Sequence, residues 1–133
     1  MGYRIRNWYM LITDFYLYLC TRIYTKTMKL IKDKEFGGER PLFATHDLKI
    51  ENIVIVDGES GIKQCQRMEC YDSKFYGKYP WWHVDGARIE RCYFAPGSRS
   101  AIWYTNDLVM RDCTIDGPKF FREMKNVELD DVV

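Results

Sequence analysis

Aromatic and basic side chains recur at one spacing along this chain, and they are the first candidates for ligand chemistry. Their neighbours in the set are nineteen to twenty-one residues apart. The set, which we call the aromatic column, reads Phe43, Lys63, Trp82, Trp103, Arg122. Aromatic faces suit the apolar side of sugar rings, and Lys or Arg suits carboxylates or sulfates. The column therefore indicates either a saccharide-binding face or a purely structural stack of rings.

The next position, which we call the corner column, carries groups that could move protons. It reads Ala44, Gln64, His83, Tyr104, Glu123. Proton abstraction by His83 or Tyr104, helped by Lys63 or Arg122, would suit a uronate lyase. A polar corner without any catalytic role is the alternative interpretation.

Other chemistry has less support. Glycoside hydrolysis needs two carboxyl groups about 5–9.5 Å apart, for which Glu123 and Asp107 are the candidates. The chain contains no Gly-x-Ser-x-Gly motif, phosphate loop or dinucleotide fingerprint. We therefore assign no catalytic residues and expect no cofactor.

Both columns belong to a repeat that runs through most of the chain. Its aligned segments are 48–55 (LKIENIVI), 68–75 (MECYDSKF), 87–94 (ARIERCYF), 108–115 (LVMRDCTI) and 127–133 (VELDDVV). A fixed period of this size indicates a solenoid, in which each coil buries its apolar side by stacking on its neighbours. We expect the first position of each segment to be buried and stacked in adjacent strands: Leu48, Met68, Ala87, Leu108, Val127.

Within each coil the pattern indicates short strands joined at corners. Leu48 and Ile50 point one way, and Ile53 and Ile55 do so again after one extra residue, which places a corner between the two strands. The corner residues are Asn52, Asp72, Arg91, Asp112, Asp131. Asn and Asp tolerate the left-handed backbone that such a bend needs, whereas the arginine has no explanation at this level.

A second corner and a third strand complete the coil. The second corner carries Gly58, Gly77, Gly97, Gly117, and we expect these glycines to supply positive φ. The inward side of the third strand reads Leu42, Ile62, Trp81, Ile102, Phe121. This pattern predicts an all-β fold, a single-stranded right-handed parallel β-helix with about five coils and a rise of about 4.8 Å per coil. A leucine-rich repeat is the alternative, although it needs leucine columns and an asparagine ladder.

Charges are balanced along the chain. Charged residues make up 29% of the sequence and the net charge is +1. This balance gives no general attraction to nucleic acid or to an anionic membrane. One outward column reads Lys49, Glu69, Arg88, Val109, Glu128, and we expect opposite charges to pair between adjacent coils.

The cysteines indicate a packed core in a reducing compartment. They are Cys20, Cys65, Cys70, Cys92, Cys113, an odd number without a C-x-x-C pair or ligand spacing to either histidine. We therefore expect no metal site and a cytoplasmic location. Cys92 and Cys113 share one column, which favours burial over a disulfide or a nucleophile.

Residues 1–27 do not share the repeat. They include seven Tyr, Phe and Trp residues, and their apolar run, 8–20, contains Asp14 and is too short to span a bilayer. Three interpretations stay open. The segment is a helical cap on the first coil, it lies on a membrane surface through its flanking arginines, or the natural protein starts at Met28.

Several short sequence segments resemble those of a known protein family. They are GGERPLF (37–43), KYPWW (78–82) and AIWYTND (101–107). From Met28 onward the chain resembles bacterial proteins grouped as domain of unknown function three-seven-three-seven. The resemblance implies a right-handed β-helix of the pectin-lyase-like type and brings no catalytic motif.

The resemblance also bears on function and on the chain's end. Family members resemble longer solenoids, so we expect 28–133 to be a truncated β-helix whose open last coil could associate end to end with another copy. The leading interpretation is a scaffold or a module that binds a carbohydrate-like ligand. The alternatives are a polysaccharide lyase or glycoside hydrolase, and a structural remnant without a ligand.

Overall fold

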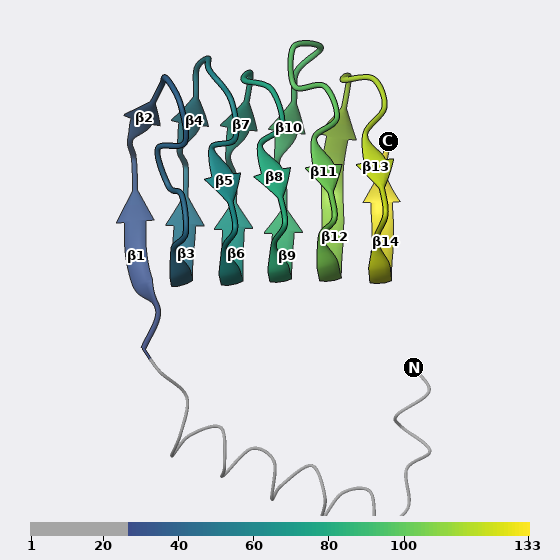
Figure 1. The fold of residues 1–133 in the computed structure, drawn as a ribbon, viewed down its shortest axis with the longest axis horizontal. Helices are drawn as coiled ribbons and strands as arrows, with labels where there is room; N and C mark the ends of the chain where they lie inside the picture. Colours follow the sequence, from purple (N-terminus) through teal and green to yellow (C-terminus); the bar gives the residue numbers. More distant parts are fainter. Residues whose placement is uncertain (1–26) are drawn as a thin grey trace, which may run out of the picture.

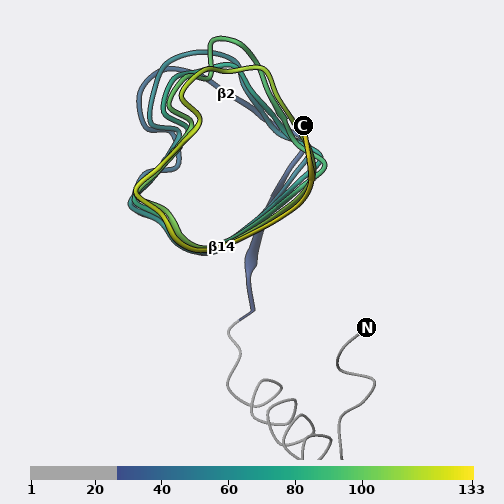
Figure 2. The same ribbon diagram turned by 90° about the vertical axis from the view of Figure 1, so that its right-hand side faces the viewer.

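The computed structural model describes residues 27–133, which form a parallel β-helix of about five turns (Figure 1). Viewed along its axis, successive turns follow nearly the same path (Figure 2). The predicted fold class is therefore confirmed. The prediction for residues 1–27 lies outside the described residues, apart from Thr27.

Each complete turn contributes three strands in parallel register. The first strands are β1 (Lys29–Lys32), β3 (His46–Glu51), β6 (Gln66–Tyr71), β9 (Asp85–Glu90), β12 (Asn106–Ile115) and β14 (Lys125–Val132). The second strands are β2 (Glu35–Phe36), β4 (Val54–Ile55), β7 (Lys74–Phe75) and β10 (Tyr93–Phe94). The third strands are β5 (Ile62–Lys63), β8 (Trp81–Trp82), β11 (Ile102–Trp103) and β13 (Phe121–Arg122). The third strands form their own sheet, whereas β12 runs through the corner and joins the first and second strands in one sheet.

The predicted apolar columns stack as expected. Leu48 pairs with Met68, and the register continues through Ala87, Leu108 and Val127. The first four are buried, but Val127 is 39% exposed because it lies in the last turn. Burial of this column therefore depends on having a turn on both sides.

The predicted left-handed corner occurs in every turn. The five corner residues have φ values of 50–54°. The structure also explains Arg91, whose Nε lies 2.7 Å from Oδ1 of Asp72 in the preceding turn. Asn52 makes the equivalent bond to Asp33, from its Nδ2 to Oδ1 at 2.8 Å. The corner thus accepts side chains that can bond to the turn before.

Positive φ was predicted for the glycines of the second corner, and this prediction is correct only at Gly58, whose φ is +80°. Gly77, Gly97 and Gly117 do not have positive φ. They are needed for space, because a Cβ at Gly77 would lie 2.6 Å from the carbonyl oxygen of Asp57 in the previous turn. Glycine here permits the backbones of successive turns to approach each other.

A methyl group at Gly77 should therefore destabilise the β-helix. We expect Gly77→Ala to lower the free energy of unfolding by about 1–3 kcal/mol, since the new Cβ must push two turns of backbone apart. Urea unfolding measures the loss. Lys78→Ala, at the exposed neighbouring position, is the matched control and should change stability by less than about 0.5 kcal/mol. An equally small change in both variants would contradict this explanation.

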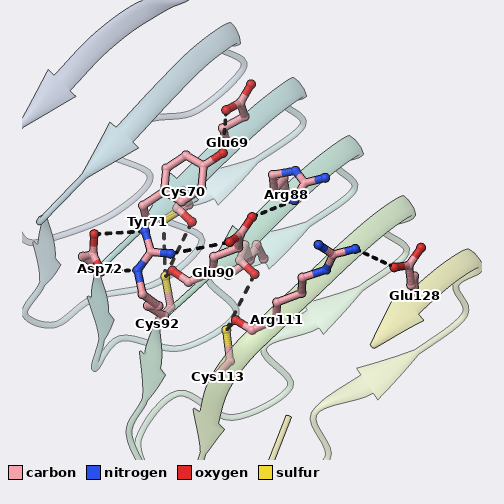
Figure 3. Close-up of polar contacts among 12 residues, drawn as sticks. Glu69, Cys70, Tyr71, Asp72, Arg88, Glu90, Cys92, Arg111, Cys113 and Glu128 are labelled. Carbon is pink, nitrogen blue, oxygen red and sulfur yellow. Dashed lines mark hydrogen bonds and ion pairs between the residues drawn. The ribbon is translucent and has the colours of Figure 1, made fainter. Parts of the chain in front are cut away.

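Charges on the outer face of the first strands pair in two ways. Arg111 Nη2 of β12 lies 2.9 Å from Glu128 Oε1 of β14, as expected for pairing between turns, whereas Lys49 and Arg88 pair within their own strands. Lys49 Nζ lies 3.2 Å from Glu51 Oε1. Figure 3 shows the corresponding pair in β9, where Arg88 Nη1 lies 2.6 Å from Glu90 Oε2. Residues i and i+2 of a strand share one face, so a long side chain reaches its own strand's carboxylate.

The described cysteines are free and buried. Cys70 Sγ lies 3.8 Å from Cys92 Sγ, beside Cys113 (Figure 3). The hydrogen bond to Cys92 and burial raise the pKa of the Cys113 thiol well above its ordinary range. A buried thiol that resists ionisation packs as a small apolar group and is a poor nucleophile.

Candidate functional site

The aromatic column lies on the outer side of the third strands. Lys63, Trp82, Trp103 and Arg122 pair in register across β5, β8, β11 and β13. Phe43 precedes them in the first turn, where the backbone N–H of the next residue donates to the carbonyl of Lys63. The structure therefore brings the whole predicted column onto one face.

The two tryptophans stack on each other. Their ring centroids are 5.3 Å apart and the rings are nearly parallel, at 6°. Lys63 Nζ lies 5.8 Å from the Trp82 ring centroid, and Arg122 Cζ lies 4.9 Å from that of Trp103. Neighbours along the axis thus occupy the ring faces. Both indoles are half-buried, so they offer mainly edges to a ligand.

The indole N–H groups fasten the stack to the backbone of the following turn. Trp82 Nε1 donates to the carbonyl of Ser100 at 2.7 Å, and Trp103 Nε1 donates to that of Lys119 at 2.9 Å. Ser100 and Lys119 occupy the corner before the third strand, with φ of 49° and 54°. Each indole therefore holds a strained corner of the next turn in place.

The corner column turns the chain from each third strand into the next first strand. Its five members all have φ between 53° and 57°. His83 and Tyr104 stack with centroids 4.7 Å apart and rings 8° from parallel. This arrangement brings the predicted pair together, and ring stacking rather than a hydrogen bond connects them.

Two adjoining hollows follow this corner along the axis. One has a volume of about 330 Å³ and is lined by His83, Asp85, Tyr104, Asn106, Glu123 and Lys125. The other, of about 240 Å³, is lined by Gln64, Cys65, Gln66, His83 and Asp85. They share His83 and Asp85, and together we call them the corner groove. Four successive turns contribute to it.

About half of the residues that line this groove lie outside the aromatic and corner columns. The polar side chains among them were not predicted from the sequence and begin the first strands, two positions after the corner column: Gln66, Asp85, Asn106, Lys125. The signal was present, because these positions keep the same period and are all polar. The carboxylate that accompanies Glu123 in the larger hollow is Asp85. Asp107, which the sequence suggested, accepts a hydrogen bond from Asn126 at 2.7 Å.

Hydrogen bonds hold the floor of the groove. Asn106 Nδ2 donates to Asp85 Oδ1 at 3.1 Å, and Asn106 Oδ1 accepts the backbone N–H of Lys125 at 3.0 Å. Within the described part of the chain, the side chains of His83 and Tyr104 stack without a hydrogen bond to another protein group. Their polar atoms remain available to a ligand.

Two further properties concern residues 27–133 alone. In this range no three His, Cys, Asp or Glu side chains are grouped so that they could hold a metal ion. The same range contains no helix that is long and apolar enough to cross a lipid bilayer.

The fold and the groove define a β-helix repeat protein with a polar groove parallel to its axis. Residues 29–133 match the family model described as "Protein of unknown function (DUF3737)", and the chain belongs to this family. Neither a curated protein nor a solved structure matches the chain.

Proposed function

We propose that this protein is a non-catalytic β-helix module that binds a saccharide-like ligand along the corner groove. The observation that carries the proposal is the pair of adjoining hollows, which share His83 and Asp85. Imidazole, phenol, amide, carboxylate and ammonium groups line them, and these are the donors and acceptors that hydroxyl groups require.

The shape of the groove supports an extended ligand. Four turns contribute side chains, and three steps of about 4.8 Å give a length of about 14 Å. Because each turn places polar side chains at the same two positions, a chain of similar units could meet polar groups at each step. A polyhydroxylated polymer has this character, whereas a compact metabolite does not need an axial repeat.

The proposed ligand contacts come from both columns. His83 and Tyr104 lie in the groove, and Trp82 and Trp103 present their edges on the adjacent face. The ligand-binding set as a whole is Phe43, Lys63, Trp82, Trp103, Arg122, His83, Tyr104. Because the two indole rings stack along the axis and cover one face of each other, we expect the ligand to bind mainly through hydrogen bonds in the groove, and ring-face contact with sugars to be secondary.

Removing the imidazole at the shared end of the two hollows should weaken binding. We expect His83→Ala to reduce affinity for a saccharide identified on a glycan array about fivefold, since one hydrogen bond contributes about 1 kcal/mol. Titration calorimetry measures the change. His46→Ala is the matched control, because His46 is an exposed histidine that bonds to Asp47 outside the groove.

An activity assay with the saccharide identified on the glycan array distinguishes binding from catalysis. If the unmodified protein releases new reducing ends from the saccharide and Glu123→Gln abolishes this release, the protein is a glycoside hydrolase and not a non-catalytic binding module. Asp85 would then be the second carboxyl group. No saccharide response in the unmodified protein would reject the proposal and leave a structural scaffold.

A further inference from the structure

Positive charge is concentrated on one side of the β-helix. We define the third-strand face as the segments that run from the corner through the third strand in each turn: 40–43, 60–63, 79–82, 100–103 and 119–122. These segments contain four cations, Arg40, Lys63, Lys119 and Arg122, and no carboxylate. The chain as a whole has a net charge of only +1, so the excess of positive charge on this face is not apparent from the composition.

Several cations elsewhere on the β-helix pair closely with carboxylates. On the first strands, Arg88 lies 2.6 Å from Glu90, and Arg111 Nη2 lies 2.9 Å from Glu128 Oε1 (Figure 3). In such pairs the carboxylate largely neutralises the cation, so the pair attracts an anionic ligand only weakly.

Three of the four cations of the third-strand face lie over aromatic rings. Among these three, Arg40 also pairs with a carboxylate, because its Nε lies 3.6 Å from Glu39 Oε1. Arg40 Cζ is 5.5 Å from the Phe43 ring centroid, and Lys63 and Arg122 cover the outer sides of the tryptophan pair. The nearest carboxylate contact of Arg122 is Glu123, 4.0 Å away, and both side chains are exposed. A cation held over a ring keeps hydrogen-bond donors free for an anion.

The spacing of these cations fits an extended anionic ligand. Lys63 and Arg122 bracket the tryptophan pair at positions three turns apart, which is about 14 Å along the axis. A single small anion could contact only one of them. A polymer with repeated anionic groups could contact both while its backbone follows the adjacent corner groove.

We propose that the third-strand face binds the carboxylate or sulfate groups of an acidic polysaccharide. This inference rests on the proposed function, because the groove holds the saccharide backbone. It adds the class of ligand: anionic chains bind, and neutral chains of equal length bind more weakly. The affinity falls with salt, because exposed charges are screened over about 10 Å at 0.1 M ionic strength.

The test compares a galacturonate oligomer, a neutral galactose oligomer of equal length and single-stranded oligothymidine by titration calorimetry. We expect the double variant Lys63→Gln/Arg122→Gln to weaken binding of the galacturonate oligomer at least tenfold and to weaken binding of the neutral oligomer much less, because the neutral oligomer offers hydroxyl groups to the corner groove and no anionic group to the cations. The control variant, Lys49→Gln/Arg88→Gln, removes two cations of the first strands and should bind like the unmodified protein. The charge-conserving variant Lys63→Arg/Arg122→Lys should restore most of the affinity, and it keeps the test valid if the double variant melts early.

Each remaining outcome contradicts a different statement. Equal binding of acidic and neutral oligomers, with a loss in His83→Ala, would reject the anionic class and retain the saccharide groove. Tighter binding of oligothymidine, with the same dependence on Lys63 and Arg122, would show a nucleic-acid partner and reject both statements. No response to any probe would also reject both.

Discussion

Replacing Trp82 and Trp103 together by alanine will lower the free energy of unfolding by about 4–6 kcal/mol. Truncation of a buried aromatic residue costs about 3–5 kcal/mol, and half-burial reduces that figure for each ring. Within this total, the ring stack contributes about 1 kcal/mol and each indole bond to the next turn contributes about 1 kcal/mol. Since small domains are stable by about 5–15 kcal/mol, this loss is a large fraction of the total.

Urea unfolding of the two single variants and the double variant measures this effect. We expect each single variant to lose about 2–3 kcal/mol. Tyr76→Ala is the matched control, because Tyr76 is an exposed aromatic residue on the second-strand side of the β-helix and should cost less than about 1 kcal/mol.

The same variants separate packing from binding. If melting is nearly unchanged while the response to saccharide disappears, the tryptophans are ligand contacts and their structural role is refuted. If stability falls as expected and the response persists in the single variants, the groove is the main site.

Truncation of Ile89 to alanine should have the second largest effect, about 2–5 kcal/mol. Ile89 is fully buried in β9, paired with Cys70 on one side and Met110 on the other. The stacked turns can close a cavity here only by shifting strands that are hydrogen-bonded in register, so little relaxation is available.

Thermal and urea unfolding give the size of the loss. Val56→Ala is the matched control, since its side chain is 43% exposed and should cost less than about 1 kcal/mol. A cost below about 0.5 kcal/mol at Ile89 would show that this position does not lie in a tightly packed core.

The repeat in the sequence predicted the fold and much of the register. A period near twenty residues positions the same residue type in each turn, and strand pairing then aligns those residues. Leu48 lies beside Met68 for this reason, and Trp82 lies beside Trp103. The left-handed corner was also predictable, because Asn and Asp occupy it in most turns.

Properties that depend on contacts between turns could not be predicted. The need for Gly77 is the close approach of the Asp57 carbonyl, and Arg91 occupies its corner beside Asp72. The partner of Lys49 is Glu51 on its own strand rather than Glu69 of the neighbouring turn, whose carboxylate accepts a hydrogen bond from the Tyr71 hydroxyl.

The candidate site, too, was predictable in part from the sequence and in part only from the tertiary structure. Sequence alone determined that Trp82, Trp103, His83 and Tyr104 occupy outward, adjacent columns, since alternation and period set side and turn. Only the tertiary structure showed that Asp85 shares the groove with His83, because a groove forms where two strands meet at an angle, which no single column describes. Likewise, only the tertiary structure showed that the tryptophan rings stack on each other and that Lys63 and Arg122 lie over them. The rotamer of each of these side chains depends on the space that the neighbouring turns leave.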